Sequence, residues 1–422
     1  MAKVVRKRWA SEIAEGLSRR DRRSCEYEAY VPDRLEGRRF QLNGDVAADV
    51  TDAERAVERL HAQSAALVDT EALARLLLRA ESVASSRIEG LEVGSRRLLR
   101  AELERDLGEG VRDVTAHEVL GNIEAMRWSV AQISAGVPIR AEHLLECHRR
   151  LLSGTRMEDY AGTIRARQNW IGGSSYNPCS AVFGPPPPEF VASLVNDLVA
   201  FCNRDDLPAV AQAAIAHAQF ETIHPFADGN GRTGRALIHL VLRRRAAATT
   251  ALVPVSLVLA TWSRDYVESL TRFRYRGSAN TSAAHEGINQ WVAFFARAVQ
   301  RAAEDAIAFE GRIRELRDAW REQLGSPRAN SAVSLLLDVL PGAPLVTVNG
   351  AAALIGRSFQ STNEGIRRLL KAGILVQINI GRRNRAFEAP GVVDAFTALE
   401  RQLASPEGDT RTSPPTRRVP RR

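Results

Sequence analysis

The segment 224–235, which reads HPFADGNGRTGR, constrains the fold of this chain more than any other stretch. Pro225 disfavours helical geometry in the residue before it, so a helix is expected to end at His224. Gly229 and Gly231 let the backbone turn before a second helix begins. The sequence therefore predicts two helices joined by a glycine-rich loop, with the N-terminus of the second helix facing that loop.

The side chains of this segment suit phosphate chemistry. Free N–H groups at a helix N-terminus bind phosphate, and Arg232 and Arg235, one helical turn apart, add charge-assisted hydrogen bonds. Asp228 suits Mg²⁺, which prefers a carboxylate together with substrate phosphates. His224 is the side chain there that is suited to accept a proton near neutral pH. These groups suffice for transfer of a phosphate-containing group to a hydroxyl.

Two other interpretations fit parts of the segment. Gly229, Gly231 and Gly234 match G-x-G-x-x-G, but a dinucleotide site needs a preceding strand and an acidic residue about 20 positions later. A helix is expected to precede this loop, and no acidic residue lies between 235 and 254. The chain has no Gly-Lys-Ser/Thr of a Walker A loop. On these residues alone, a glycine turn between two core helices stays an alternative.

The same segment resembles the signature of the Fic family (filamentation induced by cAMP), His-x-Phe-x-Asp/Glu-Gly-Asn-Gly-Arg-x-x-Arg, at all eight fixed positions. Residues 213–223 resemble the helix that leads into this signature. Gly162, Arg165 and residues 168–173 resemble the family's flap hairpin, which lays a target segment beside the site. The resemblance implies a protein adenylyltransferase that transfers AMP from ATP, with Mg²⁺, to a Ser, Thr or Tyr hydroxyl of a target protein or of the chain itself.

The resemblance also implies a role for each residue. His224 would be the general base, Asp228 the metal ligand and Asn230 a contact of the α-phosphate, while Phe226 would be a core anchor. Arg232 and Arg235 would bind the β- and γ-phosphates. The ATP-binding set is Asp228, Gly229, Asn230, Gly231, Arg232, Thr233, Gly234, Arg235 and Tyr266, where Tyr266 is the first of a family Tyr-Tyr pair whose second member is Val267 here. The flap set is Asn169, Trp170, Ile171 and Gly172.

A second motif indicates control of the activity. Residues 85–90 read SSRIEG and resemble the family's inhibitory motif, Ser/Thr-x-x-x-Glu-Gly/Asn, which gives the inhibitory set Ser85, Glu89 and Gly90. If Glu89 pairs with Arg235, that arginine cannot hold the γ-phosphate, and ATP is left in a pose unsuited to attack. We therefore expect autoinhibition in cis.

Hydrophobic periodicity predicts a mainly α fold: a Fic helical bundle with a β-hairpin flap, plus a small C-terminal winged-helix domain. Helices are expected over 71–89, 113–134, 140–152, 189–203, 208–223, 231–247, 263–275 and 287–323. We expect residues 1–24 to begin an irregular or helical arm and 25–70 to contain turns. The expected domains are an N-terminal region 1–110 with the inhibitory helix about 71–89, a Fic catalytic core 111–325, a winged helix 326–402 and a disordered basic tail 403–422.

Charge leaves room for a second class of function. The net charge of +8 (58 basic minus 50 acidic residues) lies at the two ends of the chain, with +5 in residues 1–24 and +3 in 405–422. The winged-helix region itself has an excess of basic residues, and Arg382, Arg383 and Arg385 in its wing suit phosphate contacts. A winged-helix regulator that binds DNA, a Fic enzyme with another donor, and a Fic enzyme that removes AMP are therefore alternatives. The family layout is also associated with homodimers.

The remaining composition points to the cytoplasm. No run of 18 apolar residues exists, so no membrane-spanning helix is expected, and the basic N-terminus lacks the apolar stretch of a signal peptide. The four cysteines are scattered without a CxxC pair, so we expect free thiols in a reducing cytoplasm rather than a zinc site. His217 is expected to be a core histidine.

Overall fold

The computed structural model describes residues 1–11, 16–65, 70–108, 110–247, 252–380 and 384–402. The chain divides into two compact units: a first unit of residues 1–54, 124–247 and 264–297, and a second unit of residues 55–123, 248–263 and 298–422. Each unit is built mainly from helices, as the sequence predicts, and each also holds a small antiparallel sheet. Among the described helices, none is both long and apolar enough to cross a membrane.

The first unit is formed by β1 (Lys3–Trp9), β2 (Cys25–Val31), α5 (Ala141–Leu152), η1 (Glu158–Tyr160), η2 (Pro178–Ser180), α6 (Pro188–Cys202), α7 (Ala209–Ile223), α8 (Asn230–Arg244) and α10 (Ser263–Phe273). The second unit is formed by α2 (Thr70–Ile88), α3 (Ser95–Asp106), α9 (Val255–Thr261), α12 (Ala332–Val339), β3 (Leu345–Val346), α13 (Val348–Ile355), α14 (Phe359–Lys371), β4 (Val376–Ile380), β5 (Asn384–Glu388) and α15 (Pro390–Gln402). Helices α1 (Gly44–Ala65), α4 (Val114–Gln132) and α11 (Ser282–Gln323) contribute residues to both units.

Helix α7 is the centre of the first unit. Every one of its residues is buried, and it packs against α6 and α8. Its sequence AVAQAAIAHAQF is rich in alanine, which lets neighbouring helices approach closely. The indole N–H of buried Trp291 on α11 donates to the Ala214 carbonyl of α7 at 2.8 Å. The core of this unit therefore fixes the helix that leads into the glycine-rich loop.

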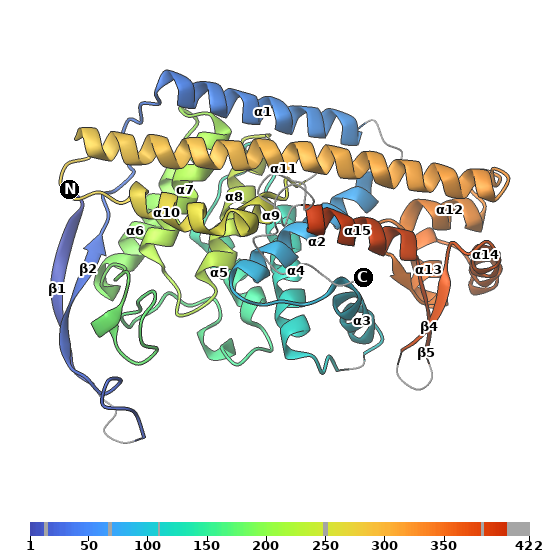
Figure 1. Cartoon of the computed structure of the whole chain (residues 1–422), viewed down its shortest axis with the longest axis horizontal. Coiled ribbons are helices and arrows are strands. Elements are labelled where there is room, and N and C mark those ends of the chain that lie inside the picture. The colour runs from blue at the N-terminus through green and yellow to red at the C-terminus, as the bar shows by residue number, and fades with distance from the viewer. Residues whose placement is uncertain (12–15, 66–69, 109, 248–251, 381–383, 403–422) are drawn as a thin grey trace. The chain divides into compact units, whose positions relative to one another are not determined.

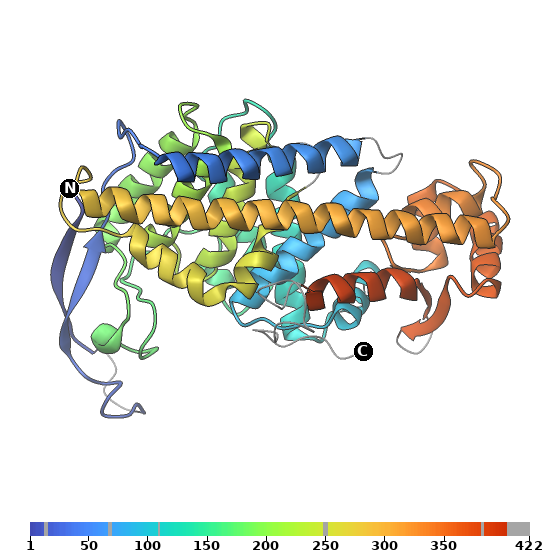
Figure 2. The same ribbon diagram turned by 45° about the horizontal axis from the view of Figure 1, so that its top comes forward.

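The expectation of an irregular or helical arm in residues 1–24 is wrong for β1. This strand pairs antiparallel with β2, from Lys3 opposite Val31 to Trp9 opposite Cys25. Its sequence KVVRKRW holds β-branched and aromatic residues among charged ones, which suits a partly exposed strand. In Figures 1 and 2 the two strands form a long ribbon at the edge of the first unit.

The expectation of four free thiols is wrong for one pair. Cys25 and Cys179 form a disulfide with 5.7 Å between their Cα atoms, although 154 positions separate them in the sequence. Cys147 and Cys202 are free and buried, and desolvation raises the pKa of these thiols to about 11 and about 12. The spacing of the cysteines gave no sign of the pair because only the folded chain brings β2 beside η2.

Residues 25–70, which were expected to contain turns, also contain β2 and the whole of α1. Helix α1 buries one apolar row at three- and four-residue spacing: Val46, Val50, Ala53, Val57 and Leu60. Helices α3, α9 and α15 were not expected either. The eight helices that hydrophobic spacing did predict are present with ends shifted by a few residues.

The second unit holds α2 through buried polar contacts. The carboxylate of Glu81, fully buried on α2, accepts hydrogen bonds from the N–H of Ser256 at 2.7 Å and from its hydroxyl at 2.5 Å, at the start of α9. Near the other end of α2, the guanidinium of Arg87 lies 2.6 Å from the carboxylate of Glu400 on α15, and both side chains are largely buried. Helix α2 is thus tied to two neighbours by charged side chains.

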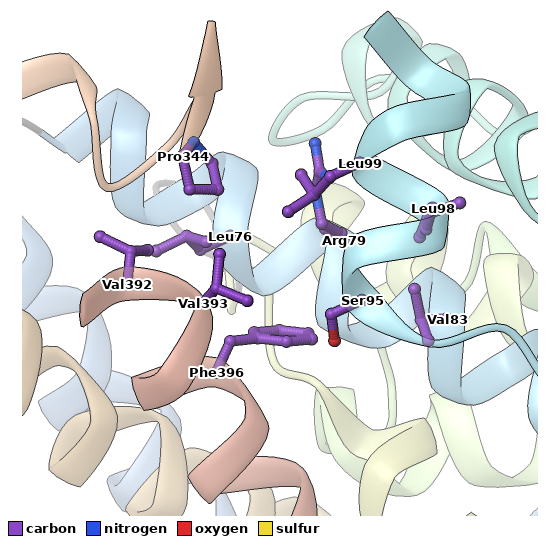
Figure 3. A pocket seen from close by; sticks show the side chains of 10 residues that line it. All are labelled: Leu76, Arg79, Val83, Ser95, Leu98, Leu99, Pro344, Val392, Val393 and Phe396. Carbon is purple, nitrogen blue, oxygen red and sulfur yellow. The ribbon is translucent and has the colours of Figure 1, made fainter. Parts of the chain in front are cut away.

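The C-terminal part of the second unit follows the order α12, β3, α13, α14, β4 and β5, with strand order β3-β5-β4 in one antiparallel sheet. Figure 3 shows a small apolar pocket in this unit, where Val392, Val393 and Phe396 of α15 face Leu76 of α2 and Leu99 of α3. Residues 403–422, expected to be a disordered tail, lie outside the described residues, as do Arg382 and Arg383.

Candidate active site

The loop between α7 and α8 begins at His224. This residue ends α7 in a left-handed conformation with φ 50°, which is unusual for a residue other than glycine. Its N–H still donates to the Phe220 carbonyl at 2.8 Å, and its Nδ1 lies 3.9 Å from a carboxylate oxygen of Glu221. The imidazole is therefore held where the helix stops and the loop turns, as the proline at the next position led us to expect.

Asn230 closes the loop on itself. Its side-chain oxygen accepts from the N–H of Phe226 at 2.8 Å, and its side-chain N–H₂ donates to the Phe226 carbonyl at 2.9 Å. Both residues are buried, and the ring of Phe226 is a core anchor as expected. These two hydrogen bonds fix the backbone of the loop, and the α-phosphate contact expected of Asn230 stays a prediction.

His148 on α5 supports the same loop, and sequence analysis missed this role. Its ring stacks on Phe226 with centroids 3.8 Å apart and planes 6° apart. The N–H of Gly162 donates to its Nδ1 at 2.9 Å, so Nε2 is the protonated nitrogen and donates to the Asp228 carbonyl at 3.0 Å. Desolvation lowers the pKa of His148 to about 4, which keeps the ring neutral. The available signal was a histidine in the apolar row Leu144, Cys147, Leu151.

Two glycines at the start of α8 are required by close packing. Gly229 precedes α8 with φ 72°, and a Cβ there would meet Leu151 at 2.9 Å. A Cβ on Gly234 would meet the carboxylate of Glu221 at 2.5 Å and the ring of Phe220 at 2.8 Å. Gly234 therefore allows α7 and α8 to approach, and the ATP contact that the resemblance implies for it stays a prediction.

The N-terminus of α8 gathers positive charge at the loop. Arg232 and Arg235 are both almost fully buried on its first turns, and the helix dipole adds a partial positive charge at this end. The side chain of Asp228 is 53% exposed and lies 3.9 Å from the guanidinium of Arg232. Gly231 and Thr233 are buried on the same helix. The arrangement pairs an anion-binding helix end with one accessible carboxylate.

The donor set of this site fits a Mg²⁺ ion that arrives with phosphates. The described residues contain no cluster of three His, Cys, Asp or Glu side chains able to hold a metal ion by themselves. Asp228 offers a single accessible carboxylate next to the anion-binding helix end. Mg²⁺ is commonly held by one or two carboxylates plus substrate phosphates, so this chemistry fits the residues present.

The expected flap is anchored to the loop. The side-chain N–H₂ of Asn169 donates to the carbonyls of His224 at 3.2 Å and Phe226 at 3.0 Å. Ile171 and Phe183 form an isolated antiparallel bridge, so the expected hairpin is reduced to one pair. Gly172 has φ 75°, and a Cβ there would meet Val182 at 2.7 Å. The Trp170 indole N–H donates to the Ser174 carbonyl at 2.6 Å.

Arg165 joins the base of the flap to the loop. Its guanidinium donates to the carbonyls of His224 at 2.8 Å, Arg167 at 3.0 Å and Pro186 at 2.6 Å. Desolvation lowers the pKa of Arg165 to about 10, so it stays charged at neutral pH. A buried arginine that binds backbone carbonyls holds three separate segments in fixed positions.

Tyr266 lies in the core. It is 4% exposed, and its hydroxyl lies 2.8 Å from Nε2 of His217. His217 is fully buried, as expected of a core histidine, and desolvation lowers its pKa to about 3. The adenosine contact implied for Tyr266 stays a prediction.

The inhibitory set spans the end of α2 in the second unit. Ser85 is buried, while Glu89 is exposed in the turn after the helix and Gly90 has φ 81°. The amide of Asn122 on α4 donates to the Ser82 carbonyl at 2.8 Å and to the Ser86 hydroxyl at 3.1 Å. The end of α2 is thereby fixed within its unit, and the pairing of Glu89 with Arg235 stays a prediction.

Comparison with known proteins gives two family matches. Residues 138–242 match the family model described as Fic/DOC family, and residues 47–131 match the model described as Fic/DOC family N-terminal. The first match includes the loop, the flap and helices α5 to α8.

Curated relatives match over part of their length. Protein adenylyltransferase fic-1 of Caenorhabditis briggsae is 32% identical over 164 residues, which cover 38% of this chain and 29% of the relative. Protein adenylyltransferase Fic of Nematostella vectensis is 28% identical over 238 residues, covering 54% of this chain and 50% of the relative. The chain therefore spans half or less of the length of these relatives.

A solved structure shares the fold. The crystal structure of a Fic family protein from Desulfovibrio desulfuricans G20 has a TM-score of 0.51 and 19% sequence identity, and the superposition covers 83% of this chain and 97% of that one.

Proposed function

We propose that this chain, whose residues 47–131 and 138–242 match two Fic/DOC family models, is a protein adenylyltransferase. It transfers AMP from ATP to a Ser, Thr or Tyr hydroxyl of a protein and releases pyrophosphate. The observation that supports this most directly is that His224 begins the short loop that leads into the N-terminus of α8, where anions can bind. Curated relatives named protein adenylyltransferase agree with it.

In the proposed mechanism, His224 takes the proton of the acceptor hydroxyl. The hydroxyl oxygen then attacks the α-phosphorus, and the bond between that phosphorus and the bridging oxygen of the β-phosphate breaks. Arg232 and Arg235 hold the β- and γ-phosphates and stabilise the charge of the leaving pyrophosphate. Asp228 would hold Mg²⁺, which supplies further neutralisation of phosphate charge when bound.

The supports around the loop serve this mechanism by positioning. The carbonyl of His224 accepts hydrogen bonds from Arg165 and Asn169, and the backbone next to Asp228 is held by His148. A base and a nucleophile must be aligned within a narrow range for attack. The flap begins at Asn169, which bonds to the carbonyl of His224, so an acceptor segment laid along it would start next to this residue.

We further propose that the activity is autoinhibited by Glu89, whose carboxylate would pair with Arg235 and displace the γ-phosphate. The resemblance of residues 85–90 to the inhibitory motif supports this, together with the fixed end of α2. Competition between a carboxylate and a phosphate for one guanidinium is decided by local concentration, which favours a tethered carboxylate.

ATP labelled at the α-phosphate tests both the AMP transfer and the autoinhibition by Glu89. Wild type, Glu89→Gly and His224→Ala are incubated with Mg²⁺ and α-labelled ATP, and intact mass identifies any adduct. Strong labelling by Glu89→Gly, weak labelling by wild type and none by His224→Ala is expected. Equal labelling by Glu89→Gly and wild type would refute autoinhibition. If only other labelled nucleotides transfer, the donor is wrong, and loss of AMP from a modified protein would favour AMP removal.

A second candidate function is nucleic-acid binding by residues 326–402, which follow the element order of a winged helix. Arg367 and Lys371 on α14 and Arg385 on β5 are exposed, and such side chains suit phosphate contacts. A labelled DNA duplex should bind with steep salt dependence and lose affinity in Arg367→Glu. Salt-insensitive or absent binding would remove this candidate.

A further inference from the structure

The β1–β2 ribbon is tied to the outer part of the flap. The disulfide between Cys25 and Cys179 links β2 to η2. The side-chain N–H₂ of Asn177 donates to the carbonyls of Arg20 at 3.0 Å and Asp21 at 2.9 Å. Figures 1 and 2 both show the ribbon beside the chain that links α5 to α6.

Two further contacts extend this tie. The hydroxyl of Ser174 donates to the carboxylate of Asp21 at 2.6 Å. The rings of Trp9 and Trp170 pack edge to face, with centroids 5.2 Å apart. Contacts of four kinds, covalent, backbone, charged and aromatic, therefore join the ribbon to residues 170–179. The ribbon and the outer flap are therefore held side by side.

The flap connects the ribbon to the reaction site. Its inner end is Asn169, bonded to the carbonyl of His224, and its outer end includes Ser174, bonded to Asp21. The flap turns between these ends, where Gly172 and Gly173 have φ 75° and φ 80°, so its ends are closer than the roughly 17 Å that five extended residues span. A segment that lays its hydroxyl at His224 and follows the flap outward would reach the ribbon within about five residues.

The far end of that path is basic. Arg19, Arg20 and Arg23 are exposed in the connection between β1 and β2, and Arg8 is exposed on β1 itself. The acidic Asp21 among them is engaged by the hydroxyls of Ser18 and Ser174. An extended acidic segment is the partner that complements these side chains in charge.

We propose that the β1–β2 ribbon and the outer flap form a docking surface for an acidic, extended segment of the acceptor protein, located up to about five residues from the acceptor hydroxyl. The inference rests on the proposed function, because it takes the hydroxyl at His224 as its starting point. It adds a rule of acceptor choice: acidic residues at a distance along the chain matter more than acidic residues next to the hydroxyl.

Synthetic peptides with one Thr acceptor test this rule. In one peptide an Asp-Glu cluster lies next to the Thr, and in two others it lies about five residues before or after the Thr. In the control peptides a Lys cluster replaces it. Binding is measured by fluorescence anisotropy without nucleotide, and AMP transfer is measured with the Glu89→Gly variant. The distant acidic cluster should bind tightest, by about ten-fold over the Lys cluster, and binding should weaken as salt rises.

Matched variants locate the surface. The triple change Arg19→Glu, Arg20→Glu and Arg23→Glu should remove the preference for the distant acidic cluster, because these side chains are exposed. The bonds of Asn177 go to backbone carbonyls and so remain in the variant. The control pair Arg34→Glu and Arg39→Glu changes exposed arginines outside the ribbon and should keep the preference.

Equal binding of the peptides at every cluster position would overturn the docking surface. So would a triple variant that still prefers the distant acidic cluster. The absence of AMP transfer to every peptide, with the binding preference intact, would count against the proposed function and leave the docking surface standing.

Discussion

His148 gives the sharpest test of how the loop is positioned. The two substitutions His148→Asn and His148→Gln each keep one of its hydrogen bonds. Asparagine places an acceptor near the position of Nδ1, so the bond from the Gly162 N–H at 2.9 Å can remain. Glutamine places a donor near the position of Nε2, so the bond to the Asp228 carbonyl at 3.0 Å can remain.

The expected loss of stability follows from these contacts. A buried hydrogen-bonding group left without its partner costs about 1–3 kcal/mol, and loss of the ring stacked on Phe226 costs about 0.5–1.5 kcal/mol. Each variant should therefore unfold with a free energy about 1.5–4.5 kcal/mol below that of wild type. Urea unfolding followed by fluorescence measures this difference.

Nucleotide binding separates the two bonds. His148→Asn loses the bond that holds the backbone at Asp228, so calorimetry should show weaker binding of ATP with Mg²⁺ than for His148→Gln. Hydrogen exchange at Gly162 should increase more in His148→Gln, which loses the acceptor of that N–H. If both variants match wild type in stability, or lose nucleotide affinity equally, His148 does not position the loop as inferred.

Three further outcomes are expected. Cys179→Ser should lower the free energy of unfolding by about 2–5 kcal/mol under oxidising conditions, because the disulfide closes a long loop; a Cys25–Cys179 peptide missing from a non-reducing digest would contradict the pair itself. Burial holds the pKa of His217 below its ordinary value of about 6.5, at about 3. Since the unfolded chain binds this proton first, stability falls by about 1.4 kcal/mol per pH unit as pH drops below about 6.5. Between pH 6 and pH 5 the stability of His217→Gln should therefore change less steeply with pH than that of wild type, by about 1.4 kcal/mol per pH unit. Equal slopes in urea titrations would disprove the lowered pKa of His217. Glu400→Gln leaves the charge of Arg87 buried without its carboxylate partner at 2.6 Å, which should cost about 3–5 kcal/mol and loosen α2. Unchanged unfolding and unchanged protease cleavage within α2 would argue against this tie.

Local sequence determined much of the helical framework. The apolar spacing of α2, α5 and α11 shows their presence without any tertiary information, because one face of each helix must be buried. The order of histidine, proline, glycines and arginines in 224–235 likewise predicts two helices and an anion-binding loop, since proline and glycine act on the backbone next to them. These are properties of neighbours in the chain.

Long-range contacts are what sequence reasoning missed. The disulfide joins residues 154 positions apart. Strand β1 pairs with β2, and the residues between the two strands did not indicate a hairpin. His148 stands 80 positions before the carbonyl that it holds. No local pattern encodes such pairs.

The roles of individual glycines and polar groups also depended on packing. Gly234 reads as part of a phosphate-binding set in the sequence, yet the carboxylate of Glu221 and the ring of Phe220 leave no space for a Cβ there. Asn230 reads as a phosphate contact, yet it bonds twice to the backbone of Phe226. The sequence by itself determined which chemistry the loop suits, because residue types set the available donors, acceptors and charges. Only the tertiary structure decided which of those groups support the loop, because burial obliges polar groups to bond to one another.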